Sequence, residues 1–256
     1  MAADLSAIDA ATTYLDALVT QDADRALLAP NVRRLHNGKV MVEGADAIRD
    51  ILRREPLAGA GDRRWVVDGE QVIVFYDVDA DLARAEGAAG APDTWIPTYI
   101  AERFLVRDGL VHEIDPIFCA DMAKNPHPER PVRYPEGDDA RDVVVAIAQS
   151  YLDSLLSHDA SAVPLAEQAY RIENGVYMGS TGAEIRAALE HSSMNFLKRI
   201  EDVRWYASPG SAVAFYTLYV DAGDGAEVVC RVGERFRVFD GELVEIEVVY
   251  STEMAS

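Results

Sequence analysis

A chain of 256 residues is long enough for one large or two ordinary domains, because one core usually serves roughly 100 to 200 residues. Its 44 acidic and 24 basic side chains give a net charge of −20, which repels phosphate backbones and anionic lipids, so we expect neither nucleic acid nor a membrane as a partner. The N-terminus lacks a basic stretch followed by an apolar run, and no run of roughly 18 apolar residues occurs, so we expect a soluble, cytoplasmic protein. Two cysteines, Cys119 and Cys230, are too few for a disulfide framework or a multi-cysteine metal site.

In the first half we expect three helices, with one strand among them, followed by a run of strands. Apolar residues at three- and four-residue spacing predict an amphipathic helix over residues 7–20, with Tyr14 on its buried stripe. The elements expected after it are a short helix near 24–28, a strand over 31–37 ended by Gly38, a helix over 44–55, and strands over 63–67, 71–79, 95–106 and 110–118. Asp-Gly pairs at 108–109 and 240–241 predict hairpin turns.

The sequence then repeats these elements. Residues 13–22 match residues 150–159, and the same offset places Arg33–Gly38 on Tyr170–Gly175. Later matches need a different offset, so insertions and deletions fall in the loops. Between the copies, residues 123–140 hold four prolines and many charges, which is typical of an extended linker. We therefore predict two α+β domains, residues 1–122 and 141–256, each a cone-shaped barrel with a curved antiparallel sheet and helices on one side.

Two carboxylates lie on faces that the alternation of the strands assigns to the core. Glu234 alternates with Val232 and Phe236, and Glu102 lies between Ile100 and Phe104. Burying a carboxylate is costly unless it is paired or protonated, and such groups gather at functional sites. Two interpretations stay open, a structural ion pair with an arginine of a neighbouring strand and an active-site acid.

The element order, the "YLDALVTQD" and "YLDSLLSHD" helices, the "HNG" and "ENG" strand ends and the closing "ERFLVRDGLVHEI" hairpin resemble the NTF2-like superfamily. It includes ketosteroid isomerase, SnoaL-type polyketide cyclases and limonene epoxide hydrolase. The tandem arrangement resembles two-domain members, some of which are cofactor-free lyases that deformylate lignin-derived diarylpropanes. The fold hosts enzymes, binding proteins and transport factors alike, so the resemblance implies the fold more strongly than a function.

The resemblance also implies roles for particular residues. In ketosteroid isomerase, which is a standard example of a carboxyl group kept neutral by an apolar site, the position of Glu102 and Glu234 holds an acid that donates a hydrogen bond to an oxyanion. Its helix tyrosine aligns with Tyr14, and its base aligns with His36 or Asn37. Here Glu replaces Asp, so steroid isomerisation is not implied. Tyr14 can equally be a packed aromatic residue of the helix stripe.

Three differences between the copies place proton carriers or charges in the first one. They are His36 for Glu173, Asp77 for Thr217 and His112 for Val244. Histidine exchanges protons near neutral pH, although a lone histidine on an apolar face is often only a core residue. Arg34 either holds an anionic group of a ligand or pairs with a buried carboxylate. His36, His112, Asp77 and Glu102 suffice for a metal site only if the fold brings them together, and we predict neither a metal nor a cofactor.

These observations predict a cofactor-independent lyase or isomerase in the first domain, acting by proton abstraction with C–C or C–O cleavage on a small, apolar, aromatic substrate. The expected catalytic residues are His112, His36, Glu102, Tyr14, Arg34 and Asp77, and the expected substrate-binding residues are Asn37, Phe75, Phe104, Ile114 and Phe118. The alternative is a non-catalytic binding or assembly module. Outward apolar residues of the closing strands predict an intramolecular pseudo-dimer, with further homo-oligomers open; these are Val111, Ile117, Leu243 and Val249.

Overall fold

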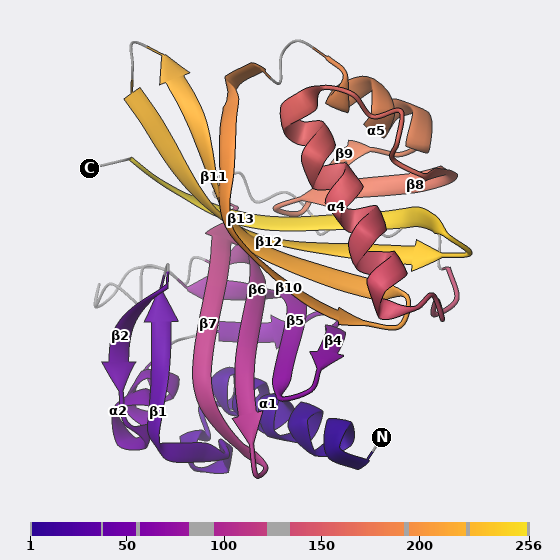
Figure 1. Ribbon diagram of the computed structural model, residues 1–256. Coiled ribbons are helices and arrows are strands. Elements are labelled where there is room, and N and C mark those ends of the chain that lie inside the picture. The colour runs from indigo at the N-terminus through magenta and orange to yellow at the C-terminus, as the bar shows by residue number, and fades with distance from the viewer. Residues whose placement is uncertain are drawn as a thin grey trace. The chain divides into compact units, whose positions relative to one another are not determined.

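The computed structural model describes residues 2–36, 38–54, 57–81, 95–121, 134–191, 195–223 and 226–254 (Figure 1). The chain divides into two compact units, residues 1–127 and 128–256, and each has its own sheet and its own hydrophobic core. Within the described ranges, no helix is both long and apolar enough to cross a membrane.

The first unit opens with helices and continues with strands, as the sequence predicts. Its elements are α1 (Ala2–Thr20), the 3-10 helix η1 (Ala23–Arg25), β1 (Leu28–His36), β2 (Lys39–Glu43), α2 (Ala45–Leu52), β3 (Leu57–Ala60), β4 (Arg64–Asp68), β5 (Gln71–Asp81), β6 (Trp95–Arg107) and β7 (Leu110–Ala120). The strand order is β2-β1-β7-β6-β5-β3, with β4 also paired to β5. Side chains of α1 and α2 share one core with this sheet, so both helices cover the same face.

The sheet differs from the expected antiparallel one in a single pairing. Strand β1 runs parallel to β7, with Arg34 opposite Ile114, while the other pairs are antiparallel. No hairpin links β1 to β7, since most of the unit separates them along the chain, and nothing therefore forces them to run in opposite directions. The sheet is mixed, and the α+β class itself is confirmed.

The second unit repeats this arrangement. Its elements are α4 (Arg141–Ser157), β8 (Leu165–Glu173), β9 (Val176–Gly179), α5 (Gly182–Leu189), β10 (Leu197–Ser208), β11 (Ser211–Gly223), β12 (Ala226–Phe239) and β13 (Glu242–Met254). The strand order is β10-β11-β12-β13-β8-β9, and β8 is parallel to β13 with Arg171 opposite Ile246. Figure 1 shows α4 and α5 on one face of this sheet, and both contribute to its core. The second copy differs from the expected pattern at one element, because the residues that follow α4 form a turn rather than a short helix.

Two short strands that the sequence analysis did not predict follow the repeated Asn-Gly pairs. In the second unit Asn174 (φ 42°) and Gly175 (φ 78°) both have positive φ, which is the backbone of a type I′ hairpin turn, and this turn joins β8 to β9. In the first unit Gly38 (φ 73°) stands in the turn between β1 and β2. An Asn-Gly pair at a strand end therefore marks a hairpin rather than the end of the sheet.

The last residues of the expected linker belong to the second unit. Arg237 donates hydrogen bonds to the carbonyls of Tyr134 and Pro135, and Gly210 donates one to the carbonyl of Asp139. Gly137 packs so closely that a Cβ there would lie 2.1 Å from the Val238 oxygen, so only glycine fits. Residues 134–140 are thus held against the hairpin turns of that unit, while residues 122–133 lie outside the described residues.

Candidate active site

Four side chains from four elements form a buried polar cluster inside the first unit. We call Tyr14 on α1, Arg34 on β1, Tyr76 on β5 and Glu102 on β6 the first cluster. The Tyr76 hydroxyl donates a hydrogen bond to Glu102 Oε2 at 2.8 Å. Burial, reinforced by the charges of Glu102 and Tyr14, raises the pKa of Tyr76 well above its usual 10.0, against the opposing charge of Arg34. Tyr76 therefore stays protonated and acts as a hydrogen-bond donor.

Local structure explains why these polar groups face the core. Tyr76 alternates with Val74 and Val78, and all three belong to the core. Tyr14 lies on the buried stripe of α1, where its ring meets Phe104 edge-on with centroids 5.4 Å apart. Phe104 and its cross-strand neighbour Ile114, two of the predicted substrate-binding residues, are fully buried core residues on the face that carries the cluster.

The second unit contains the same four residue types at equivalent positions. We call Tyr151, Arg171, Tyr216 and Glu234 the second cluster. The Tyr216 hydroxyl donates to Glu234 Oε2, again at 2.8 Å, and the Arg171 guanidinium lies 5.9 Å from the Tyr151 ring centroid. Burial raises the pKa of Tyr151, although the positive charge of Arg171 opposes the shift. The duplication has therefore preserved a complete polar constellation and not only a hydrophobic pattern.

The two clusters differ in the residue two positions after the arginine. In the second unit Glu173 forms an ion pair with Arg171, and both side chains are largely buried, with exposures of 18% and 11%. Burial raises the pKa of Glu234 to about 7, while Arg171 and the Tyr216 hydrogen bond lower it and Glu173 raises it further. The other carboxyl oxygen of Glu234, Oε1, is buried without a hydrogen-bond partner among the described residues. The guanidinium of Arg171 therefore interacts with two carboxyl groups, those of Glu173 and Glu234.

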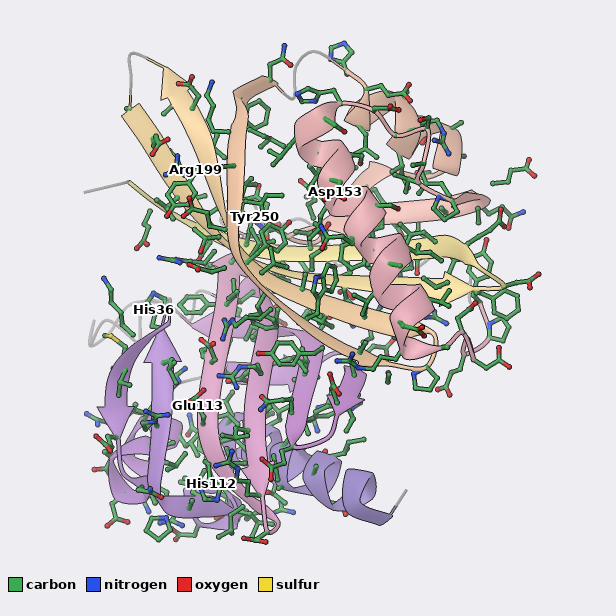
Figure 2. All side chains as sticks on the ribbon, in the orientation of Figure 1. His36, His112, Glu113, Asp153, Arg199 and Tyr250 are labelled. Carbon is green, nitrogen blue, oxygen red and sulfur yellow. The ribbon has the colours of Figure 1, made fainter. Side chains whose placement is uncertain are left out.

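In the first unit the equivalent position is His36, at the end of β1 (Figure 2). Val32 is a core residue, so strand alternation puts Arg34 and His36 on the same face. The His36 ring lies 5.6 Å from the ring of Phe118, centroid to centroid. Phe118 is 41% exposed although it shares its face with fully buried Ile114, so the side chains of this face are less covered at the end of β7 than in its middle.

His112 lies outside this arrangement, because a β-bulge breaks the alternation on which its expected position rested. Val106 pairs with Val111 and Leu105 pairs with Glu113, which leaves His112 as the extra residue. Val111 takes the core position instead, so the expected outward position of Val111 is wrong. Figure 2 shows His36 and His112 at opposite ends of the first unit's strands. The bulge recurs in the second unit at Val244, where Leu243 enters the core, so its expected outward position is also wrong.

Phe75 and Asp77 alternate with Tyr76 along β5 and therefore point to the opposite face of the sheet. Asp77 lies 3.9 Å from Arg64, and a Cβ at Gly61 would come within 2.3 Å of its carboxylate. This places Asp77 against the loop before β4 and away from the first cluster. The structure does not bring Phe75 and Asp77 together with the other predicted site residues.

Asn37, the remaining predicted residue, lies outside the described residues. Its equivalent Asn174 bonds to the backbone of Tyr250: Nδ2 donates to the carbonyl at 3.2 Å, and Oδ1 accepts from the amide at 2.9 Å. Asn174 thereby ties the end of β8 to β13, which is a structural role.

Tyr76 and Tyr216 are the members of the clusters that the sequence analysis missed. The signal was present, because "VFYDVD" and "AFYTLY" keep Phe-Tyr at matched positions while the residues around them change. A tyrosine on a core strand is otherwise indistinguishable from a packed aromatic residue.

The sheet face opposite the cluster carries a separate ionic network. Arg103 lies 3.5 Å from Asp115 and also pairs with Glu113, and Glu113 bonds to Arg33 at 2.6 Å. The second unit has the same pattern around Arg235. These ion pairs lie on the face of the sheet opposite to the face that carries Glu102. Among the described residues, no group of three or more His, Cys, Asp or Glu side chains is placed to hold a metal ion.

Solved structures similar to the chain include an NTF2-like protein from Cytophaga hutchinsonii, at 14% identity, with a TM-score of 0.35, 44% of this chain covered and 89% of that protein. An LEH-like epoxide hydrolase from M. tuberculosis matches at 19% identity, with a TM-score of 0.38 and coverages of 47% and 86%. An NTF2-like protein from Burkholderia xenovorans matches at 13% identity, with a TM-score of 0.37 and coverages of 47% and 93%. Two of these descriptions name the superfamily that the sequence resembles.

No curated protein matches the chain. One family model does match, and it matches twice, over residues 4–118 and 137–250. The two matched ranges contain every member of both clusters and confirm the tandem form expected from the repeat. The chain therefore belongs to the family described as Domain of unknown function (DUF8021), of which it carries two copies.

Proposed function

We propose that the first domain is a cofactor-independent acid/base enzyme, a lyase or isomerase that abstracts a proton and cleaves or shifts a C–C or C–O bond. Its substrate is a small, largely apolar, aromatic molecule, such as a lignin-derived diarylpropane. The observation that carries the proposal is the first cluster, a largely buried set of hydrogen-bonding groups on the sheet face that also carries the His36 imidazole and the partly exposed ring of Phe118.

The cluster supplies what such chemistry requires. A carbonyl or phenol oxygen that gains negative charge is stabilised by preorganised donors, and Tyr14 and Arg34 supply O–H and N–H groups for this role, since the one hydroxyl hydrogen of Tyr76 is donated to Glu102. Glu102 orients Tyr76 through their hydrogen bond. His36 takes the proton and returns it, since an imidazole exchanges protons near neutral pH. No part of this scheme needs a cofactor.

The rim favours a flat, apolar substrate. Phe118 exposes an aromatic face next to His36, and Phe104 and Ile114 close the other end of the concave surface. Aromatic rings stack in offset or edge-on geometry on such surfaces. We assign the chemistry to the first domain, because the position of His36 is taken by an ion-paired carboxylate in the second.

Turnover of a panel of aromatic alcohols and ketones, followed across pH, tests the proposal. We expect product formation that Tyr14→Phe lowers, with Tyr151→Phe as the matched change in the second domain. If the panel binds in calorimetry but the wild-type protein turns over none of it at any pH, the alternative of a binding module takes the place of the enzyme.

We also retain residues 1–122 and 141–256 as the proposed limits of the two repeated domains, with residues 134–140 packed against the second domain. The expected pseudo-dimer and further homo-oligomer stay predictions. Sedimentation of the full chain and of the two separately expressed halves measures both, and halves that are stable and monomeric would contradict the pseudo-dimer.

A further inference from the structure

Three neighbouring strands of the second sheet bring two carboxyl groups and one guanidinium together on the core face. Glu234 on β12 and Glu173 on β8 are both cross-strand partners of Val248, a core residue on β13 between them. Neighbouring strands are about 4.8 Å apart, so the two glutamates stand about 10 Å apart in one row. Arg171 precedes Glu173 by two residues and therefore projects from the same face of β8. Its guanidinium forms an ion pair with Glu173, and its charge also acts on Glu234.

Glu234 and Arg171 each have one buried polar atom without a hydrogen-bond partner. The Tyr216 hydroxyl donates to Oε2 of Glu234, but Oε1 accepts no hydrogen bond from the described residues. The Nε–H of Arg171 has no acceptor among them either, although the same guanidinium pairs with Glu173. Buried polar atoms without partners are uncommon in folded proteins. The second cluster therefore contains one unused acceptor and one unused donor, on groups of opposite charge.

The cost of the unused acceptor depends on the proton of Glu234. A neutral carboxyl group with one unpaired oxygen is an unsatisfied dipole, whereas a carboxylate in the same place is a buried charge, which costs more. Burial raises the pKa of Glu234 to about 7, with a further contribution from Glu173 and against the charge of Arg171, so both forms exist near neutral pH. The ionised form needs a donor for Oε1, and Arg171 has one unused.

The other titratable groups around Glu234 supply no competing charge. Tyr151 on α4 and Tyr216 on β11 are both buried, and burial raises the pKa of both hydroxyl groups, so they stay neutral. Strand β13 places apolar side chains on this face. Among the described residues, the charges that act on Glu234 are therefore those of Arg171 and Glu173.

We propose that the second cluster is a proton-operated switch, in which the proton on Glu234 decides the partner of Arg171. While Glu234 carries the proton, the guanidinium pairs with Glu173, as in the structure. When Glu234 releases the proton to solvent, the Nε–H of Arg171 donates to Glu234 Oε1 and the pair with Glu173 loosens. Glu173 directly precedes the turn that joins β8 to β9, so the switch acts at the end of β8. It lies in the second domain and does not rest on the function proposed for the first.

Nuclear magnetic resonance of the full chain with isotope-labelled arginine and glutamate tests the inference. The Nε–H signal of Arg171 is identified by its absence in Arg171→Lys, and the carboxyl signal of Glu234 by its absence in Glu234→Gln. Both are followed from about pH 5.5 to about pH 8.5. We expect them to move together with one midpoint near pH 7, the Nε–H signal toward the position of a hydrogen-bonded proton.

Two variants of similar shape separate the switch from a general effect of pH. In Glu234→Gln, which has no titrating group at this place, the Nε–H signal should not move. Glu167→Gln, an exposed change on β8, should leave the wild-type midpoint unchanged. An Nε–H signal that stays still while Glu234 titrates, or one that moves equally in Glu234→Gln, would overturn the switch. So would a Glu234 carboxyl that does not titrate in this range.

Glu173→Gln removes the carboxylate that competes for Arg171. Because the negative charge of Glu173 raises the pKa of Glu234, this change should lower the midpoint by about one pH unit or more. The Nε–H signal should then have the position of the bonded form over most of the range. An unchanged midpoint would contradict the competition. If Glu234→Gln does not fold, as judged by circular dichroism, the titration of Glu173→Gln still decides.

Discussion

The two domains hold the same tyrosine–arginine–tyrosine–glutamate cluster, and they differ most clearly at the position shared by His36 and Glu173. In the second domain the arginine is ion-paired within its own strand, and a buried glutamate beside it titrates near neutrality. In the first domain the same position carries an imidazole beside the partly exposed ring of Phe118. At this one position the second cluster has a carboxylate that pairs with its arginine, and the first cluster has an imidazole.

The largest expected effect comes from breaking the ion pair of the second domain. Arg171→Met leaves Glu173 without its buried partner, and the loss of one member of such a pair costs about 3–5 kcal/mol. Chemical unfolding monitored by fluorescence measures this loss. Adding Glu173→Leu to Arg171→Met should recover much of it, and a single-variant loss below about 1 kcal/mol would show that the pair is not buried in solution.

The pKa of Glu234 makes the stability of the second domain depend on pH. The folded pKa of about 7 lies above the usual 4.5, so the neutral form stabilises the fold below pH 4.5 and this contribution is lost as the pH rises through 7. The free energy of unfolding of the wild type should therefore fall by about 3 kcal/mol relative to Glu234→Gln across that interval. Urea unfolding at several pH values measures it, with the exposed change Glu201→Gln as a control that should run parallel to the wild type. A constant difference between the wild type and Glu234→Gln would contradict the shift.

Activity should depend on the histidine at the rim and not on the one in the bulge. His36→Ala removes the proposed base and should lower kcat by at least about a hundredfold, the usual range for a general base. His112→Ala should stay within about threefold of the wild type, because the structure places His112 at the other end of the strands. Steady-state kinetics on any substrate found active measures both. A larger loss from His112→Ala would reverse the assignment.

The smallest expected effect tests whether the equivalent tyrosine–glutamate hydrogen bonds of the two domains contribute equally to stability. Tyr76→Phe and Tyr216→Phe each remove a 2.8 Å hydrogen bond to a buried glutamate, so each should lower the free energy of unfolding by about 2 kcal/mol. Similar losses are expected because the bonds are equivalent. Denaturant unfolding of the two variants measures them, and a loss in only one domain would show that the two clusters are not equivalent in solution.

The sequence predicted burial correctly for residues whose positions follow a regular periodicity. Glu102 and Glu234 follow the alternation of straight strand segments, and Tyr14 follows the spacing of an amphipathic helix. Val111 was assigned to the wrong face because a bulge adds His112 to the alternation, and no local signal marks it. Phe75 and Asp77 were chosen by residue type without applying the alternation that places Tyr76 inside.

The ion pair of Arg171 was beyond sequence reasoning for a different reason. Glu173 lies on the same strand as Arg171, and Glu234 lies on β12, with only β13 between that strand and β8. Which carboxylate pairs with Arg171 depends on distances that the spacing of residues in the sequence does not encode. The linker shows a related limit. Its prolines and charges suggest an extended segment, yet Gly137 and Asp139 are held by backbone bonds and close contacts to the turns of the second unit.

The bulge at His112 and Val244 also records the history of the chain. The bulge occurs at the same point in both copies. The register shifts between Leu105 and Val106 where β6 pairs with β7, and between Arg237 and Val238 where β12 pairs with β13. Because an extra residue stands at the same point in both halves, we infer that a single ancestral domain already contained the bulge before it was duplicated. The difference between His112 and Val244 arose afterwards, at a site that the ancestor had already released from strict alternation.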